Sequence, residues 1–137
     1  AALGCTAEKK PITAQEFSQR MEQEGYAILD VTDQFEGQVL SATLAVEQDG
    51  AYQIEFFEVE TEQQAKTAFA QNKATFESEQ GAAASRYENN GRNFSVYVQT
   101  SNGKYSYVCR GGQTFIYASV PEQNKDAVKS AIKSLGY

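Results

Sequence analysis

Carboxylates and tyrosines are the side chains of this 137-residue chain that could do chemistry, because the sequence contains no histidine. It therefore has no Ser-His-Asp triad, no Cys-His pair and no histidine metal site. Two cysteines are too few for a structural zinc site of the usual kind. The glycines follow the spacing of turns and not that of a phosphate-binding loop. We expect no cofactor and no metal, and only carboxylates could support catalysis.

Six carboxylates fall into two groups near the ends of expected strands. A pair of carboxylates at a suitable separation can cleave a glycoside, so a small carboxylate-dependent hydrolase is an alternative function. Carboxylates on one strand face more often mark a solvated edge, and a calcium site lacks the spacing of an EF-hand loop. We assign no catalytic residue. The two groups are Glu55, Glu58 and Glu60, and Asp30, Asp33 and Glu36.

Tyrosines recur on consecutive expected strands in the second half of the chain. Tyrosine offers a flat apolar ring and a hydroxyl, which suits a binding surface. Tyr97 alternates with the apolar residues of its strand, so we expect it on the outer face of the sheet. The alternative is that these side chains are packing pairs, which strand propensity alone favours. The candidate binding surface consists of Tyr97, Tyr105, Tyr107 and Tyr117.

The segment Ala2-Leu3-Gly4-Cys5 places small residues directly before a cysteine. It resembles the end of a lipobox, the signal that precedes the processing of bacterial lipoproteins. The resemblance implies a lipid on Cys5 and an exported domain, anchored to the outer face of the bacterial cell membrane. Residues 1–11 would be a tether, and residues 12–137 a single domain. Alternatively, Cys5 is an ordinary tail residue, or it pairs with Cys109 in a disulfide.

Three capping boxes predict three helices. In each, Ser or Thr is followed three residues later by Glu or Gln, so that each side chain bonds a free backbone N–H group. Gly25 and Gly136 are expected to stop the first and third helices in the left-handed conformation. The pairs are Thr13 with Glu16, Thr61 with Gln64, and Ser119 with Glu122.

Between these helices the apolar period changes from 3.6 to 2, and tight turn pairs such as Asp49-Gly50 and Asn102-Gly103 separate the strands. The predicted fold class is α+β. It comprises an antiparallel sheet of six to seven strands in two meanders with three helices, in the order α-βββ-α-ββββ-α. Because residues 56–65 resemble residues 115–123, an internal duplication is a hypothesis. We expect the helices on one face of the sheet, so that the other meets water, a partner or a second layer.

Charge is divided unevenly along the chain. Residues 1–80 carry a net charge of −10 and residues 81–137 a net charge of +4, for a total of −6. An acidic chain is a poor candidate for nucleic-acid binding, which depends on neutralising phosphates. The division favours two solvated faces, with a self-association or partner surface as the alternative. No segment approaches the roughly 18 apolar residues that span a bilayer, so we expect membrane contact only through Cys5.

These observations predict an exported, surface-attached, non-catalytic domain. Its expected task is to bind a protein, peptide or cell-envelope component through the sheet face. The alternatives are the small carboxylate-dependent hydrolase and a structural, self-associating module.

Overall fold

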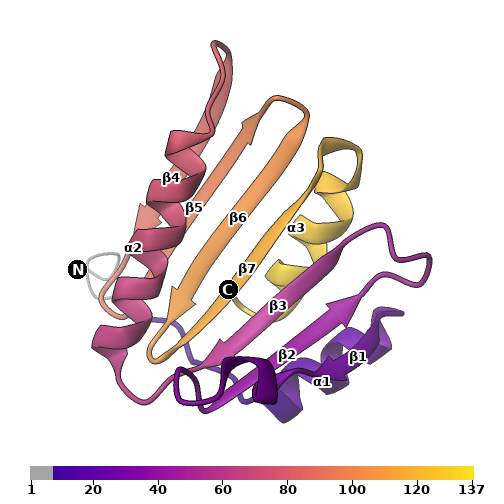
Figure 1. The fold of residues 1–137 in the computed structure, drawn as a ribbon, viewed down its shortest axis with the longest axis vertical. Helices are drawn as coiled ribbons and strands as arrows, with labels where there is room; N and C mark the ends of the chain where they lie inside the picture. Colours follow the sequence, from indigo (N-terminus) through magenta and orange to yellow (C-terminus); the bar gives the residue numbers. More distant parts are fainter. Residues whose placement is uncertain (1–7) are drawn as a thin grey trace, which may run out of the picture.

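The computed structural model describes residues 8–137, which form one seven-stranded antiparallel sheet flanked by helices (Figure 1). The predicted order α-βββ-α-ββββ-α is confirmed. Short 3₁₀ helices, η2 and η3, follow the first and last strands. The elements are α1 (Ala14–Gln23), β1 (Ala27–Asp30), η2 (Thr32–Phe35), β2 (Ser41–Val46), β3 (Gln53–Glu58), α2 (Glu62–Ser78), β4 (Ala84–Asn90), β5 (Phe94–Ser101), β6 (Lys104–Gly111), β7 (Thr114–Pro121), η3 (Glu122–Asn124) and α3 (Lys125–Ser134).

The two meanders meet through their last strands. The strand order is β1-β2-β3-β7-β6-β5-β4, with Phe56 of β3 opposite Ile116 of β7. Tight turns fix the register within each meander. In the β5–β6 turn, both Asn102 (φ 53°) and Gly103 (φ 76°) have positive φ, as a type I′ hairpin turn requires.

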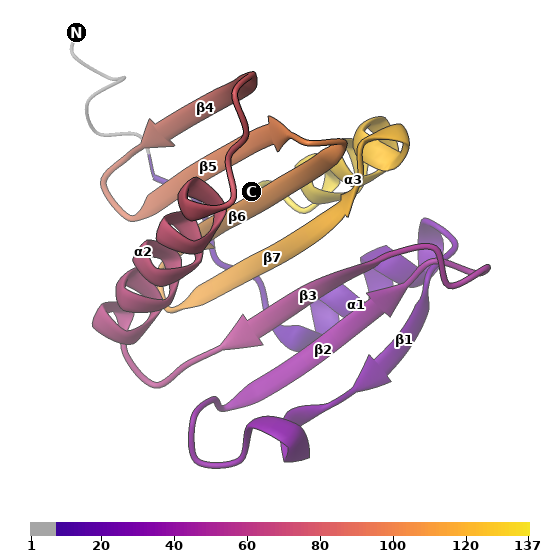
Figure 2. The same cartoon turned by 45° about the horizontal axis from the view of Figure 1, so that its top comes forward.

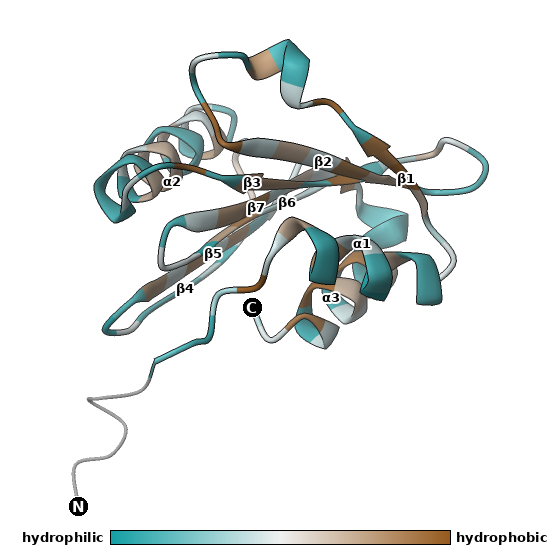
Figure 3. Ribbon diagram, turned by 90° about the horizontal axis from the view of Figure 1, so that it is seen from below, coloured by the Kyte–Doolittle hydropathy of each residue, from teal (hydrophilic) through white to brown (hydrophobic). Residues whose placement is uncertain are grey.

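Helices cover both faces of the sheet, so the expectation that they share one face is wrong. Figure 3 shows α1 and α3 on one side of the sheet, with α2 and η2 on the other. On the first side, the ring of Phe17 in α1 stacks on Phe56 of β3, with centroids 5.0 Å apart. On the second, Phe76 of α2 stacks on Tyr117 of β7 at 5.5 Å. Because α1 and α2 lie on opposite faces, the two α-then-meander units differ in arrangement, and their duplication stays a hypothesis.

The first two capping boxes are confirmed, and the third is wrong. The amide of Glu16 donates to Thr13 Oγ1 at 3.1 Å, and that of Gln64 donates to Thr61 Oγ1 at the same distance. Ser119 instead belongs to β7, which stays paired with β6 as far as Pro121. The sheet ladder therefore overrides the local capping pattern, and α3 begins at Lys125 after η3.

Part of the expected tether is docked on the domain. The amide of Lys9 donates to Asn93 Oδ1 at 2.8 Å, and Asn93 Nδ2 donates to the Lys9 carbonyl at 2.7 Å. The ammonium of Lys9 lies 4.6 Å from the ring centroid of Phe94. The packed domain therefore begins at Lys9 at the latest, whereas Cys5 lies outside the described residues. Within residues 8–137, no helix is both long and apolar enough to cross a membrane.

Candidate functional site

Three of the four tyrosines in the predicted binding surface are buried. Tyr97 is 2% exposed, Tyr105 4% and Tyr107 1%. Tyr97 does lie on the face opposite Val96, as its alternation predicts, but α2 covers that face. Its hydroxyl donates to Gln99 Oε1 at 2.8 Å beneath the helix. Tyr105 and Tyr107 belong to the core on the α1 and α3 side. An exposed surface made of these tyrosines does not exist.

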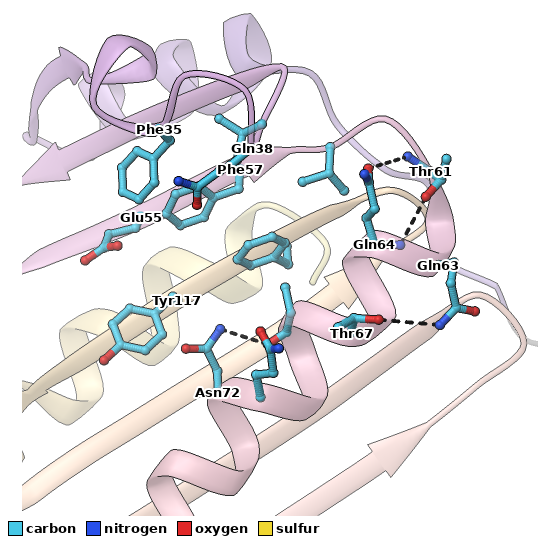
Figure 4. A pocket seen from close by; sticks show the side chains of 15 residues that line it. Phe35, Gln38, Glu55, Phe57, Thr61, Gln63, Gln64, Thr67, Asn72 and Tyr117 are labelled. Carbon is cyan, nitrogen blue, oxygen red and sulfur yellow. Dashed lines mark hydrogen bonds between the residues drawn. The ribbon is translucent and has the colours of Figure 1, made fainter.

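Tyr117, the fourth tyrosine, is half-buried and borders a groove of about 510 Å³ on the α2 side of the sheet (Figure 4). We call it the amide groove, because side-chain amides line its rim. Its floor consists of Glu55, Phe57, Phe115 and Tyr117 from β3 and β7. The segment from η2 to β2 forms one wall with Phe35, Gln38 and Val39, and α2 forms the other with Gln63, Gln64, Thr67, Ala68, Gln71 and Asn72.

The floor of the amide groove is a rigid aromatic cluster. Phe57 and Phe115 stack with centroids 4.7 Å apart, and Phe35 meets Phe57 edge-on at 5.3 Å. Stacked and edge-to-face pairs contribute about 0.5–1.5 kcal/mol each beyond the area that they bury. The groove is therefore preformed, and its apolar floor needs no rearrangement to receive a ligand.

The rim supplies hydrogen-bonding groups that the fold does not fully use. Gln64 Oε1 accepts from the amides of Glu60 and Thr61, which leaves its NH₂ group available. Asn72 Nδ2 donates to the carbonyl of Ala68 at 2.9 Å, which leaves its Oδ1 available. The side-chain carboxamides of Gln38 and Gln71 make no hydrogen bond within the described part of the chain. Since a carboxamide both donates and accepts, this rim can satisfy an uncharged polar ligand.

Glu55 is the one ionisable group in the amide groove other than Tyr117. Burial raises the pKa of its carboxyl group, although a 3.1 Å hydrogen bond from Gln53 acts in the opposite direction. No lysine or arginine lines the groove. The site therefore favours a neutral or positively charged ligand over an anion.

The other candidate carboxylates do not converge on Glu55. Glu58 lies on the opposite face, where it accepts from the amide of Ala14 and from Ser41 Oγ. Asp30 accepts from the amide and hydroxyl of Thr32 in a local turn. Glu60, Asp33 and Glu36 are exposed. Over residues 8–137, no three Cys, Asp or Glu side chains gather closely enough to hold a metal ion.

Cys109 is a free thiol enclosed in the core. Burial raises its pKa to about 12, while the charges of Lys9 and Lys133 act in the opposite direction. The thiol therefore stays protonated at neutral pH and behaves as a small apolar side chain.

An uncovered apolar strip continues from the amide groove across β1–β3. Leu29, Leu44, Glu55 and Tyr117 stand in register on four adjacent strands. Leu44 is half-buried, and Leu29 is 53% exposed. Figure 2 shows α2 over the other end of the sheet, while over β1–β3 on this side only the short η2 packs, with Phe35 on Phe57. Part of the sheet face expected to meet water or a partner is therefore found on this half, and the edge strand β4 at the other end is also exposed.

No protein-family model, curated protein or solved structure matches this chain. The site therefore has to be assessed from its own geometry. Sequence reasoning identified Glu55 and Tyr117 but missed the walls of the groove. One signal was present, because Gln64, Ala68, Gln71 and Asn72 recur at helical spacing and so share one face of α2.

Proposed function

We propose that this domain is a non-catalytic binding module that holds an extended peptide segment of a partner protein in the amide groove. The observation that carries the proposal is the combination of an aromatic floor with a rim of partly unused amides. The carboxamides match the alternating donors and acceptors of a peptide backbone, and the floor accepts an apolar side chain. The carboxylate of Glu55, without any cation in the lining, favours a neutral or basic segment.

The dimensions of the groove agree with a short extended segment. Gln64 and Asn72 are eight residues apart on α2, which corresponds to about 12 Å along the helix axis. That length accommodates roughly four residues of extended chain. Leu29 and Leu44 would continue the contact, since they extend the apolar surface beyond Glu55.

A selection from a random peptide library on the immobilised domain tests this proposal. We expect peptides with an apolar anchor and no net negative charge to be enriched. The variant Ala68→Arg would fill the groove from the α2 wall and should weaken the selected peptides at least about tenfold. Ala70→Arg is the matched control, because Ala70 is exposed on the same helix and lies outside the groove.

Two results would contradict the proposal. Peptides that bind Ala68→Arg as tightly as the parent protein would place the binding site elsewhere. A concentration-dependent dimer in sedimentation, abolished by Leu29→Lys, would show that a second copy of the chain covers the strip. The second result would support the self-associating module in place of a peptide receptor.

We also propose that the domain is exported and held at the outer face of a bacterial cell membrane by a lipid on Cys5. The lipobox-like Ala2-Leu3-Gly4-Cys5 supports this localisation, and the burial of the free thiol of Cys109 argues against the alternative in which Cys5 pairs with it. Mass spectrometry of the native protein tests it. We expect a lipid-modified N-terminal cysteine, and an unmodified peptide that begins upstream of Cys5 would overturn the assignment.

A further inference from the structure

A second groove, of about 410 Å³, lies on the opposite face of the sheet from the amide groove. We call it the lysine groove. Its floor consists of Val98, Tyr105 and Tyr107 of β5 and β6. Three lysines of α3 form one wall, and residues of the edge strand β4 form the other, with the ring of Tyr87 54% exposed. The lysines are Lys125, Lys129 and Lys133.

The charge of the lysine groove is opposite to that of the whole chain. Its lining holds the three lysines and no carboxylate, although the chain carries a net charge of −6; Arg86 also borders it, but its place in β4 directs its side chain to the α2 face. The lysines recur every four residues and therefore follow one side of α3. None of them forms an ion pair with any described residue. Glu88 of β4 is directed to the other face, where it pairs with Lys73 at 2.8 Å.

The hydroxyls of Tyr105 and Tyr107 provide a second, independent indication of a ligand. Both side chains are more than nine-tenths buried and line the groove, yet neither hydroxyl has a hydrogen-bond partner within residues 8–137. The hydroxyls of the other buried tyrosines are partnered: Tyr97 donates to Gln99, and Tyr137 bonds Thr114. Neither hydroxyl is among the fully enclosed unpartnered atoms of residues 8–137, so both are open to the groove and can donate to a ligand bound there.

Both hydroxyls remain donors at neutral pH. Burial raises the pKa of Tyr105 to about 12, and the charge of Asp126 contributes to this rise. Burial also raises the pKa of Tyr107. The groove therefore presents two neutral O–H donors beneath a row of ammonium groups.

We propose that the lysine groove binds an organic phosphate, with its phosphate on the lysines and tyrosine hydroxyls and its apolar part on the rings of the floor. Three ammonium groups and two hydroxyl donors converge on this groove. A doubly charged phosphate can use all of them, whereas a singly charged carboxylate would need fewer, so the groove suits a phosphate. Val98 and the faces of Tyr87 and Tyr107 offer apolar contact to the rest of the ligand. This site is independent of the amide groove, because it lies on the other face and favours the opposite charge.

Phenyl phosphate is a suitable probe, because it combines a phosphate with a small apolar ring. In a titration followed by ¹H–¹⁵N NMR, we expect saturable shifts at Tyr105, Tyr107 and along α3, with a dissociation constant of about 1 mM or below. Inorganic phosphate should bind several-fold more weakly, because it lacks the ring, and phenol should produce no saturable shifts there. Shifts spread over all lysines of the chain, without saturation, would overturn the proposal.

Conservative variants separate the groove from general charge attraction. Tyr105→Phe/Tyr107→Phe removes both hydroxyls without breaking a hydrogen bond of the described fold, and we expect about tenfold weaker binding of phenyl phosphate. Tyr97→Phe, a buried tyrosine on the other face, is the matched control and should leave binding unchanged. Lys129→Gln should weaken binding about threefold, whereas Lys66→Gln on α2 should not.

A membrane source of phosphate is distinguished with vesicles. If the double tyrosine variant binds phenyl phosphate as tightly as the parent, the proposal is wrong. In that case, binding to phosphatidylglycerol vesicles that is lost with Lys129→Gln would show that the lysines act only as a charged surface. If the parent protein binds phenyl phosphate through both hydroxyls and does not bind these vesicles, the ligand is a soluble organic phosphate.

Discussion

The two halves of the sheet differ in how many of their faces are covered. Strands β5–β7 lie between α2 on one side and the α1 and α3 layer on the other, so that Tyr97, Val108 and Tyr107 are all buried. Strands β1–β3 have α1 on one side, while on the other side the short η2 covers Phe57 with Phe35 and leaves Leu29 exposed. The same alternating pattern thus produces two buried faces in one half and one open face in the other. Residues that could bind a partner protein through the open sheet face therefore belong to the half formed by β1–β3.

The largest loss of stability should come from a substitution that leaves a cavity under α2, in the half of the sheet that is covered on both faces. Phe76→Ala removes a ring that is 1% exposed and stacked on Tyr117, and should lower the free energy of unfolding by about 3–5 kcal/mol. Leu44→Ala, on the same sheet face in the open half, should lower it by about 1 kcal/mol or less. Urea unfolding measures both, and similar losses would show that the open strip is covered in solution.

A smaller loss is expected at the only buried arginine in the described chain, Arg110. Its guanidinium donates to Glu62 in the first turn of α2 at 3.1 Å, and its Nε has no partner. Because Glu62 is half-exposed and screened, Glu62→Ala should lower the free energy of unfolding by about 2 kcal/mol. Glu60→Ala, an exposed carboxylate just before the helix, should change it by about 0.5 kcal/mol at most. Equal effects of the two variants would mean that the ion pair does not fasten α2 to the sheet.

Two tyrosine hydroxyls on opposite faces of the covered half should differ in their effect on stability. Tyr97→Phe removes hydrogen bonds with Gln80 and Gln99 and should cost about 1 kcal/mol. Tyr107→Phe removes a hydroxyl without a partner among the described residues and should leave stability unchanged or slightly higher. Thermal unfolding of both variants in phosphate-free buffer tests the difference. A clear loss of stability with Tyr107→Phe would show that its hydroxyl is already satisfied within the protein.

The smallest effect concerns the carboxylate of the open half. Burial raises the pKa of Glu55 in the folded protein, so the fold binds this proton more tightly than the unfolded chain does. The charged carboxylate therefore destabilises the fold above its folded pKa, and the penalty disappears as the pH falls below the unfolded pKa. Glu55→Gln should raise the melting temperature by roughly 1 °C at pH 7 and not at all below about pH 4. No difference at pH 7 from Glu22→Gln, an exposed control, would show that Glu55 is fully hydrated.

Local signals in the sequence predicted most of the fold. The capping boxes at Thr13 and Thr61 and the Asn102-Gly103 turn act within four residues, so their outcome hardly depends on the rest of the chain. The period of two also placed Tyr97 and Val96 on opposite faces. It could not show that α2 would cover Tyr97, because that depends on contacts between residues distant in sequence. The wall of the amide groove at Phe35 was missed for the same reason.

The hydrogen bonds of Asn93 fix the point at which the N-terminal segment leaves the domain. Lys9 is held there by these hydrogen bonds. Burial lowers the pKa of its ammonium group, and the nearby charge of Lys133 lowers it further. Three residues lie between Lys9 and Cys5, so the four Cα–Cα steps that join them reach at most about 14 Å. With the proposed lipid on Cys5, the lysine groove would be confined to a thin shell above the membrane. A ligand attached to the same surface would then have a millimolar effective concentration, and a weak site would be filled without a high affinity.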